Sequence, residues 1–188
     1  MNVVNSSFYL DMRQYIRYRI PGGCYFFTVV LACRTGRYLV DHIHTLRAAF
    51  HEVKQAHPFR LDALVILPDH LHCIWTLPEG DDDFPTRWFL IKSSFARALP
   101  QIERRSASRI RKGERSVWQR RYWEHAIRDN LDYQRHIDYI HYNPVKHGYV
   151  RQVGDWQYST FHRYVRLGIY PPDWAGGMED ELDGAGIE

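Results

Sequence analysis

The stretch LPDHLHCIWTLP, residues 67–78, decides the fold. From its fourth residue onward the side chains alternate, with His70 and His72 on one face of a strand and large apolar side chains on the other. Residues 59–67 form a second apolar run, and a Pro-Asp pair separates the two runs. The pattern predicts a β-hairpin whose second strand presents two imidazoles on one face.

The segments on either side of this hairpin complete the pattern of a small α+β domain. The predicted elements, in chain order, are strand 25–33, helix 43–57, strand 59–67, strand 70–77, helix 84–99, strand 124–127 and helix 130–143. Pro144 is expected to stop the last helix. The order β-α-β-β-α-β with an appended helix is that of the ferredoxin-like fold, an antiparallel sheet with helices packed on one face. The other face is then open, and the two histidines are expected to lie there.

Charge is distributed unevenly along the chain. Its 188 residues include 25 Lys and Arg against 22 Asp and Glu, for a net charge of +3. Residues 173–188 hold six acids and no Lys or Arg, which leaves +9 on residues 1–172. We therefore predict one domain at 1–172, which includes an arginine-rich insert at 100–117, and an acidic C-terminal tail at 173–188. A basic body indicates either a polyanionic ligand or a solvated surface.

Several classes of protein are excluded by composition. No run approaches the ~18 apolar residues of a membrane span, and the N-terminus lacks a basic region followed by an apolar one. We therefore expect neither a membrane partner nor a secretory leader. The three cysteines are widely spaced and form no Cys-x-x-Cys pair, which indicates a reducing compartment. The cytoplasm is the expected location.

Two clusters of residues are candidates for chemistry. On a strand, His70 and His72 point to the same side, so both imidazoles can reach one metal ion. On the last helix, Tyr139 and Asn143 are four residues apart, which places a phenol beside an amide oxygen that a hard divalent ion accepts. The alternative is structural: two histidines on a solvated strand face, a core tyrosine, and an asparagine that caps the helix end.

Taken together, the two clusters supply what transesterification of a phosphodiester requires. A metal ion held by histidines polarises the phosphate and takes up charge from the leaving oxygen. A neighbouring tyrosine oxygen attacks the phosphorus, which leaves a covalent phosphotyrosine and a free 3′-hydroxyl. The combination therefore predicts a nuclease or strand-transfer enzyme with a tyrosine nucleophile.

Four segments of the chain resemble a known family. The segment at 67–78 is similar to the HUH (His-hydrophobe-His) motif of the REP-associated tyrosine transposases, relatives of the single-tyrosine HUH transposases of small bacterial insertion sequences. WEHAIR at 123–128, DYIHYNPVKHG at 138–148 and DWQYSTF at 155–161 resemble the later blocks of that family. The segments occur in the same order, and the combination is more specific than any one of them.

The resemblance implies a specific site and substrate. His70, His72 and Asn143 would bind a divalent ion, Mg²⁺ or Mn²⁺, and Tyr139 would be the nucleophile. It implies a ferredoxin-like HUH core and single-stranded DNA with hairpins of repetitive extragenic palindromes (REP), flanked by a short conserved tetranucleotide. Such enzymes cleave and rejoin DNA through a 5′-phosphotyrosine. No obligatory protein partner is indicated, and the protein is expected to be a monomer or a homodimer.

The basic segment between residues 87 and 121 is the expected contact surface for this DNA. Eleven Lys and Arg lie there against two Glu. Basic side chains bind phosphates and aromatic rings stack on unpaired bases. The residues expected to bind DNA are Arg87, Lys92, Arg97, Arg120, Arg121 and Tyr122.

Two other functions remain open at the level of sequence. The first is a DNA or RNA hairpin-binding module that keeps the fold without catalysis. The second is a His-x-His metallohydrolase that uses activated water and forms no covalent adduct. Detection of a covalent protein–DNA adduct distinguishes the tyrosine enzyme from both.

Overall fold

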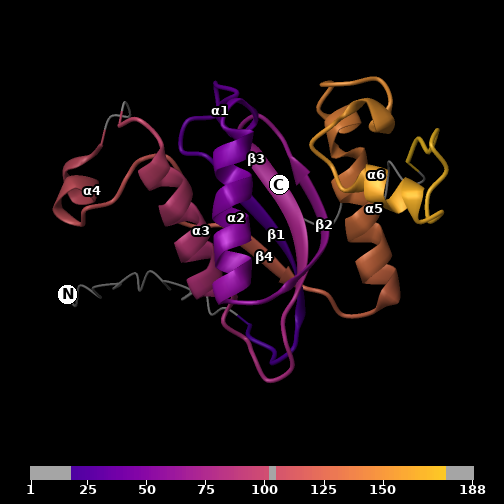
Figure 1. Cartoon of the computed structure of the whole chain (residues 1–188), viewed down its shortest axis with the longest axis horizontal. Helices are drawn as coiled ribbons and strands as arrows, with labels where there is room; N and C mark the ends of the chain where they lie inside the picture. Colours follow the sequence, from indigo (N-terminus) through magenta and orange to yellow (C-terminus); the bar gives the residue numbers. More distant parts are fainter. Residues whose placement is uncertain (1–17, 102–104, 177–188) are drawn as a thin grey trace, which may run out of the picture.

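The computed structural model describes residues 18–101 and 105–176 (Figure 1). Its elements are β1 (Cys24–Val30), α1 (Tyr38–Asp41), α2 (Ile43–Ala56), β2 (Arg60–Ile66), β3 (His70–Thr76), α3 (Phe84–Ala98), α4 (Ala107–Arg111), β4 (Trp123–Ala126), α5 (Asn130–Lys146), the 3₁₀ helix η1 (Val153–Asp155) and α6 (Phe161–Arg166). None of the described helices combines the length and the apolar composition needed to cross a bilayer.

The four strands form one antiparallel sheet in the order β2-β3-β1-β4. This is the strand order of a ferredoxin-like fold, and the predicted α+β class is confirmed. In the sheet, Thr28 of β1 pairs with His72 of β3 on one side and with Trp123 of β4 on the other. Val30 pairs with His70. The two histidines therefore lie at the same end of the sheet as the start of edge strand β4.

One face of the sheet is an aromatic layer covered by α2 and α3. Trp75 of β3 stacks on Trp88 of α3 with ring centroids 4.3 Å apart and meets the ring of Phe50 of α2 edge-on at 6.3 Å. Phe27 of β1 contacts both tryptophans. All four side chains are buried. Burial of each such ring stabilises the fold by roughly 1.5–3 kcal/mol, so this layer is the main hydrophobic core.

The opposite face of the sheet is covered by α5, which corrects the expectation that it is open. Figure 1 shows α5 across the sheet from α2 and α3. Phe26 of β1 contacts the rings of His136 and Tyr139 in α5, with centroids 4.7 and 6.0 Å apart. The helix carries buried apolar residues of its own, among them Ile137 and Ile140. Because that apolar stripe must be removed from water, the appended helix packs on the free face of the sheet.

Pro144 does not end α5, contrary to the sequence prediction. The helix continues to Lys146, and the His147 N–H still donates to the carbonyl oxygen of Asn143 at 3.0 Å. A proline loses the hydrogen bond of its own nitrogen and crowds the carbonyl four residues before it, but the residues after it can still donate, and here it stands in the last turn, where few helical bonds remain to be disturbed. Asn143 therefore stays in helical alignment with Tyr139.

The described chain ends against the outer side of α5. Trp174 packs on Tyr170, with ring centroids 4.6 Å apart, and on Phe161. Gly176 has a φ of +85°, and a Cβ there would lie 2.6 Å from the Tyr142 ring, so only glycine fits. The acidic tail expected at 173–188 thus begins packed on the body. Residues 177–188 lie outside the described residues, and the division of the chain at 172 stays a prediction.

Candidate active site

Both histidines of the His-x-His motif are held by their Nδ1 atoms. Nδ1 of His70 donates to Asp69 Oδ1 at 2.7 Å, and Nδ1 of His72 lies 2.9 Å from the Thr28 hydroxyl oxygen. Both side chains are buried, and their ring centroids are 5.0 Å apart. Hydrogen bonds at Nδ1 orient the rings and leave Nε2 as the atom for a ligand. Asp69 thus orients the His70 ring, whereas Glu124 of β4 pairs with Phe27 and lies on the other face of the sheet.

The electrostatics of the pair favour neutral imidazoles. Burial lowers the pKa of His70, although Asp69 acts against that shift. Burial holds the pKa of His72 well below its ordinary value, and the nearby positive charge of Lys146 adds to the effect. Burial raises the pKa of Asp69, but hydrogen bonds from His70 and Arg34 outweigh it, so the carboxyl stays ionised. Neutral imidazole is the form that binds a metal ion.

One face of α5 lies over the two histidines. Tyr139 and His147 on that face are eight residues apart, with Asn143 midway. The Tyr139 ring lies 5.2 Å from the His72 ring, and the His147 ring lies 5.1 Å from the His70 ring. Since residues four apart share a helix face, Asn143 lies on this face of α5, between these two contacts along the helix. His147 was given no role by sequence, although its four-residue spacing from Asn143 could have indicated one.

Three atoms in this cluster are buried without a hydrogen-bond partner among the described residues: His72 Nε2, Asn143 Oδ1 and Asn143 Nδ2. Asn143 is fully buried, and His72 is 2% exposed. Each unmet polar group costs about 1–3 kcal/mol, so such atoms need an explanation. An imidazole nitrogen and an amide oxygen are both ligands of divalent ions such as Mn²⁺ and Mg²⁺. The residues present therefore fit a divalent metal site.

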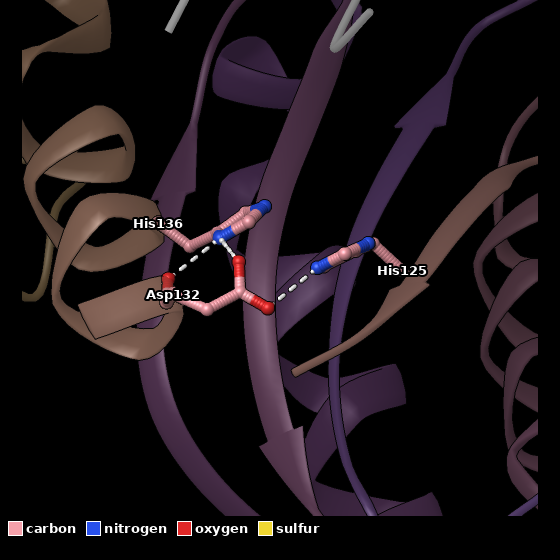
Figure 2. Close-up of side chains that lie close together, drawn as sticks. All are labelled: His125, Asp132 and His136. Atoms are coloured by element: carbon pink, nitrogen blue, oxygen red, sulfur yellow. Dashed lines mark hydrogen bonds and ion pairs between the residues drawn. The ribbon is translucent and has the colours of Figure 1, made fainter. Parts of the chain in front are cut away.

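A second cluster, His125, Asp132 and His136, brings ligand atoms within 4.8 Å of one another (Figure 2). In this cluster His125 Nε2 lies 2.8 Å from Asp132 Oδ2, and His136 Nδ1 lies 3.2 Å from Asp132 Oδ1. His136 Nδ1 also donates to the backbone carbonyl of Asp132 at 2.7 Å. The imidazole rings are nearly parallel, at 14°, so their in-plane lone pairs do not converge on one point.

Hydrogen bonds occupy the Asp132 carboxylate, His125 Nε2 and His136 Nδ1, whereas His136 Nε2 is buried without a partner among the described residues. Asp132 also accepts from the backbone N–H of Arg128 at 3.0 Å. Burial raises the pKa of Asp132, but the bonds from His125 and Arg128 outweigh it and lower the value to about 2. We interpret the cluster as an anchor that fastens the first turn of α5 to β4. It sits two helical turns before Tyr139, so it also fixes the helix that carries the phenol.

No family model matches the chain. Among curated proteins, it is 51% identical to the REP-associated tyrosine transposase of Escherichia coli (strain K12) over 169 residues, which cover 90% of this chain and 94% of the relative. It is 47% identical to a putative REP-associated tyrosine transposase of Haemophilus influenzae (strain Rd), over 92% of this chain and 99% of the relative. The chain belongs to the REP-associated tyrosine transposases.

A solved structure of this transposase family has the same fold. It is described as a REP-associated tyrosine transposase bound to a REP hairpin, is 51% identical to this chain and has a TM-score of 0.79. The match covers 90% of this chain and 94% of that one. The likeness therefore extends over most of the length of both chains.

Arg87 is not part of a DNA surface in this transposase, which corrects the sequence prediction. Its side chain is 2% exposed. It donates to both carboxylate oxygens of Asp81, at 2.6 and 3.1 Å, and to the backbone carbonyls of His57, Pro58 and Asp83. The guanidinium ties the loop after β3 to the end of α2. A charged residue inside a basic stretch looks exposed in sequence, and only the fold reveals its burial.

The remaining predicted DNA contacts lie on the face of the sheet that carries α2 and α3. One groove between α3 and α4, here named the α3–α4 groove, is lined by Phe89, Lys92, Arg97, Lys112, Arg120 and Tyr122, among others. The Tyr122 ring contacts Phe27 and Trp88 of the aromatic layer. Arg121 is exposed in the loop before β4. The structure thus gathers four of the six predicted residues, but not beside Tyr139.

Proposed function

We propose that this transposase cleaves and rejoins single-stranded DNA by transesterification, with Tyr139 as the nucleophile and with His70, His72 and Asn143 as ligands of Mg²⁺ or Mn²⁺. One observation carries the proposal. Tyr139 and Asn143 share one face of α5, the Tyr139 ring contacts His72, and the buried atoms His72 Nε2 and Asn143 Oδ1 have no hydrogen-bond partner among the described residues. The Tyr139 and His72 rings are in contact, with centroids 5.2 Å apart, so the proposed nucleophile is a direct neighbour of a proposed metal ligand.

The proposed step exchanges one phosphoester for another. The phenol oxygen of Tyr139 attacks the phosphorus, the bond to the 3′ oxygen breaks, and the proton lost by the phenol is balanced by the one the 3′-hydroxyl gains. The product is a 5′-phosphotyrosine, and attack by a 3′-hydroxyl reverses the step and rejoins the strand. A divalent ion in the site supplies charge neutralisation of the phosphate and of the leaving oxygen.

Nearby cationic charge assists the phenol. Lys146 Nζ lies 5.4 Å from the centroid of the Tyr139 ring. A positive charge at that distance favours negative charge on the phenol oxygen as its proton leaves. Because Tyr139 is 7% exposed, little water screens the interaction.

The proposed substrate is DNA that carries a REP-type hairpin. The support is the solved relative that is bound to such a hairpin, together with the basic α3–α4 groove. Lys92, Arg97, Arg120, Arg121 and Tyr122 remain the proposed DNA contacts. The cytoplasmic location and a monomeric or dimeric state are part of the proposal.

Loss of the Tyr139 hydroxyl tests the mechanism. Oligonucleotides that carry the inverted repeats near the protein's own gene are incubated with the protein and Mn²⁺, and covalent adducts are resolved on a denaturing gel. We expect Tyr139→Phe to form no adduct and to bind the hairpin almost normally, since only the nucleophilic oxygen is removed.

Tyr142→Phe is the matched control, because it removes a phenol one turn away on the same helix and should leave adduct formation intact. Full adduct formation by Tyr139→Phe contradicts the proposal, and loss in Tyr142→Phe alone would assign the nucleophile to Tyr142. Cleavage without any adduct in the unsubstituted protein indicates a hydrolase. Hairpin binding without cleavage indicates a binding module.

A further inference from the structure

The α3–α4 groove has the size and charge of a nucleotide site. Its volume is about 610 Å³, within the range of ligand pockets. Six cations and one carboxylate, Glu114, line it. The electrostatic potential in the groove is therefore positive, which favours binding of a phosphate over binding of a neutral ligand.

The cations of the groove have two different roles. Arg115 donates to the carbonyls of Ala96, Leu99 and Pro100 at 2.7–3.2 Å, and Arg109 donates to the carbonyls of Arg115 and Trp118, so these two arginines hold the wall of the groove together. Arg97 and Lys112 are exposed and make no hydrogen bond or ion pair within the part of the chain that the structure describes. These two charges remain available to a ligand.

Phe89 provides an aromatic surface in this groove. It is on α3, one turn before Lys92, and its side chain is 66% exposed, with no ring contact among the described residues. An exposed phenylalanine beside free cations is the arrangement that binds an unpaired base on a ring and its phosphate on a charge. A duplex offers phosphates but keeps its bases stacked on one another, so its bases are not available to stack on such a ring.

The edge of the sheet connects this groove to the active site. Tyr122 and Trp123 are neighbours at the start of β4, which pairs only with β1. The Tyr122 ring points to the groove side, where it contacts Trp88, and the Trp123 ring points to the α5 side, where it lies 5.6 Å from Phe26. A strand that passes around this edge meets an aromatic ring on each side before it reaches Tyr139.

We propose that the α3–α4 groove binds unpaired nucleotides of the same DNA strand that is cleaved, with Phe89 as a stacking surface and Arg97 and Lys112 as phosphate contacts. The inference rests on the proposed function for its substrate. It adds a binding site on the opposite face of the sheet from the metal ligands. The strand would run from this groove around the β4 edge to Tyr139.

The test measures binding of a thymidine oligonucleotide of about twenty nucleotides by fluorescence anisotropy. We expect Phe89→Ala to weaken binding about tenfold and Phe89→Trp to restore it, because stacking on one base contributes about that factor. Leu167→Ala is the matched control, since Leu167 is also 66% exposed but lies at the end of α6. It should bind normally.

The salt dependence separates stacking from charge. Arg97→Gln should lower the slope of log affinity against log salt by about 0.7, the value for one phosphate contact on a single strand, while Phe89→Ala leaves the slope unchanged. An affinity of Phe89→Ala equal to that of Leu167→Ala overturns the proposal. So does an equal loss on a duplex of the same length, or tighter binding of the matching uridine oligonucleotide, which would assign the groove to RNA.

Adduct formation on the hairpin is followed in parallel, so that failures can be told apart. If no adduct forms but Phe89→Ala still weakens thymidine binding, the proposed reaction fails and the groove assignment stands. If the adduct forms and Phe89→Ala changes nothing, the groove assignment fails and the reaction stands.

Discussion

The two faces of the sheet are built from alternate residues of the same strands, yet they differ in the polarity of the side chains that they bury. On β3, Trp75 points to the α2/α3 face and stacks on Trp88, whereas His72 points to the α5 face and meets Tyr139. The first face is almost wholly aromatic and aliphatic. The second carries buried polar atoms, some bonded, as in Asp132, and some unmet, as in Asn143.

This difference separates stability from function along a single strand. Apolar burial on one face holds the fold together. On the other face, satisfied polar groups add to stability and unmet ones reduce it, and three of the unmet atoms, on His72 and Asn143, belong to the candidate metal site. The predictions below test this separation, with the largest effect first.

Trp75→Ala should destabilise the protein by about 3–5 kcal/mol, because it removes the ring that joins β3 to α2 and α3 and leaves a cavity. Urea unfolding followed by circular dichroism measures the loss. The control is His72→Ala on the other face of the same strand, which should abolish cleavage and change stability far less. Equal destabilisation by the two substitutions would contradict the separation of the faces.

Asp132→Asn should lower the free energy of unfolding by about 2 kcal/mol at pH 7, because the pKa of Asp132 lies at about 2 against an ordinary 3.8. A carboxyl with a lowered pKa stabilises the fold fully above its unfolded pKa and loses that contribution as pH falls. The difference from the unsubstituted protein should therefore persist above about pH 4 and vanish towards about pH 2.

Unfolding curves at several pH values check this prediction. Asp155→Asn is a suitable control, since Asp155 is exposed and its carboxylate has no bond among the described residues. A difference that does not shrink in acid would mean that Asp132 acts through shape rather than charge.

Asn143→Ala should raise the unfolding free energy of the metal-free protein by about 1 kcal/mol, because it removes two unmet polar atoms and introduces a better helix former. It should also reduce cleavage, and high Mn²⁺ should restore part of it, since water can replace an amide ligand. The same Mn²⁺ should not rescue His70→Ala or His72→Ala. Equal and unrescued loss in all three would assign Asn143 a structural or DNA-positioning role.

Deletion of residues 177–188 should have the smallest effect. The described chain ends at Gly176, against Tyr142 on α5, and five carboxylates follow it in the sequence. An acidic segment tethered beside a basic protein competes with DNA at a high effective concentration. We expect about threefold tighter single-strand binding at low salt and no change above about 0.3 M, where charges are screened. A tail with amides in place of carboxylates should behave like the deletion, and identical salt curves for full-length and truncated protein would rule out competition.

Sequence predicted the elements of the fold closely because their signals are local. The alternation after His70 and the helical spacing before Pro58 each belong to one segment, and the strands and helices of the core begin and end within a few residues of the predicted limits. The placement of α5 on the sheet, in contrast, is not determined by its own sequence alone. An apolar stripe predicts that a helix is buried, but which face of the sheet it covers depends on the space left by α2 and α3.

Local signals also explain why part of the candidate site could be predicted from the sequence. His70 and His72 share a face by strand period, and Tyr139 and Asn143 by helix period, so each pair is visible in sequence. That the two pairs meet requires the sheet and α5 to be packed together. Arg87 shows the opposite case: its charge suggested a DNA contact, and its burial depends on backbone carbonyls of His57 and Pro58 and on the Asp81 carboxylate, which belong to two other segments.

The packing of α5 over the face that carries the two histidines limits, by steric hindrance, which DNA could reach the site in the proposed reaction. His72 and Tyr139 are 2% and 7% exposed, so in the proposed reaction a phosphate has to approach groups that α5 largely covers. A duplex is a stiff rod, bent only at considerable cost, and its phosphates are held on a wide cylinder. A single strand is thinner and more flexible. In the proposed reaction, the packing of α5 over the histidines would therefore favour the unpaired strand over the paired stem.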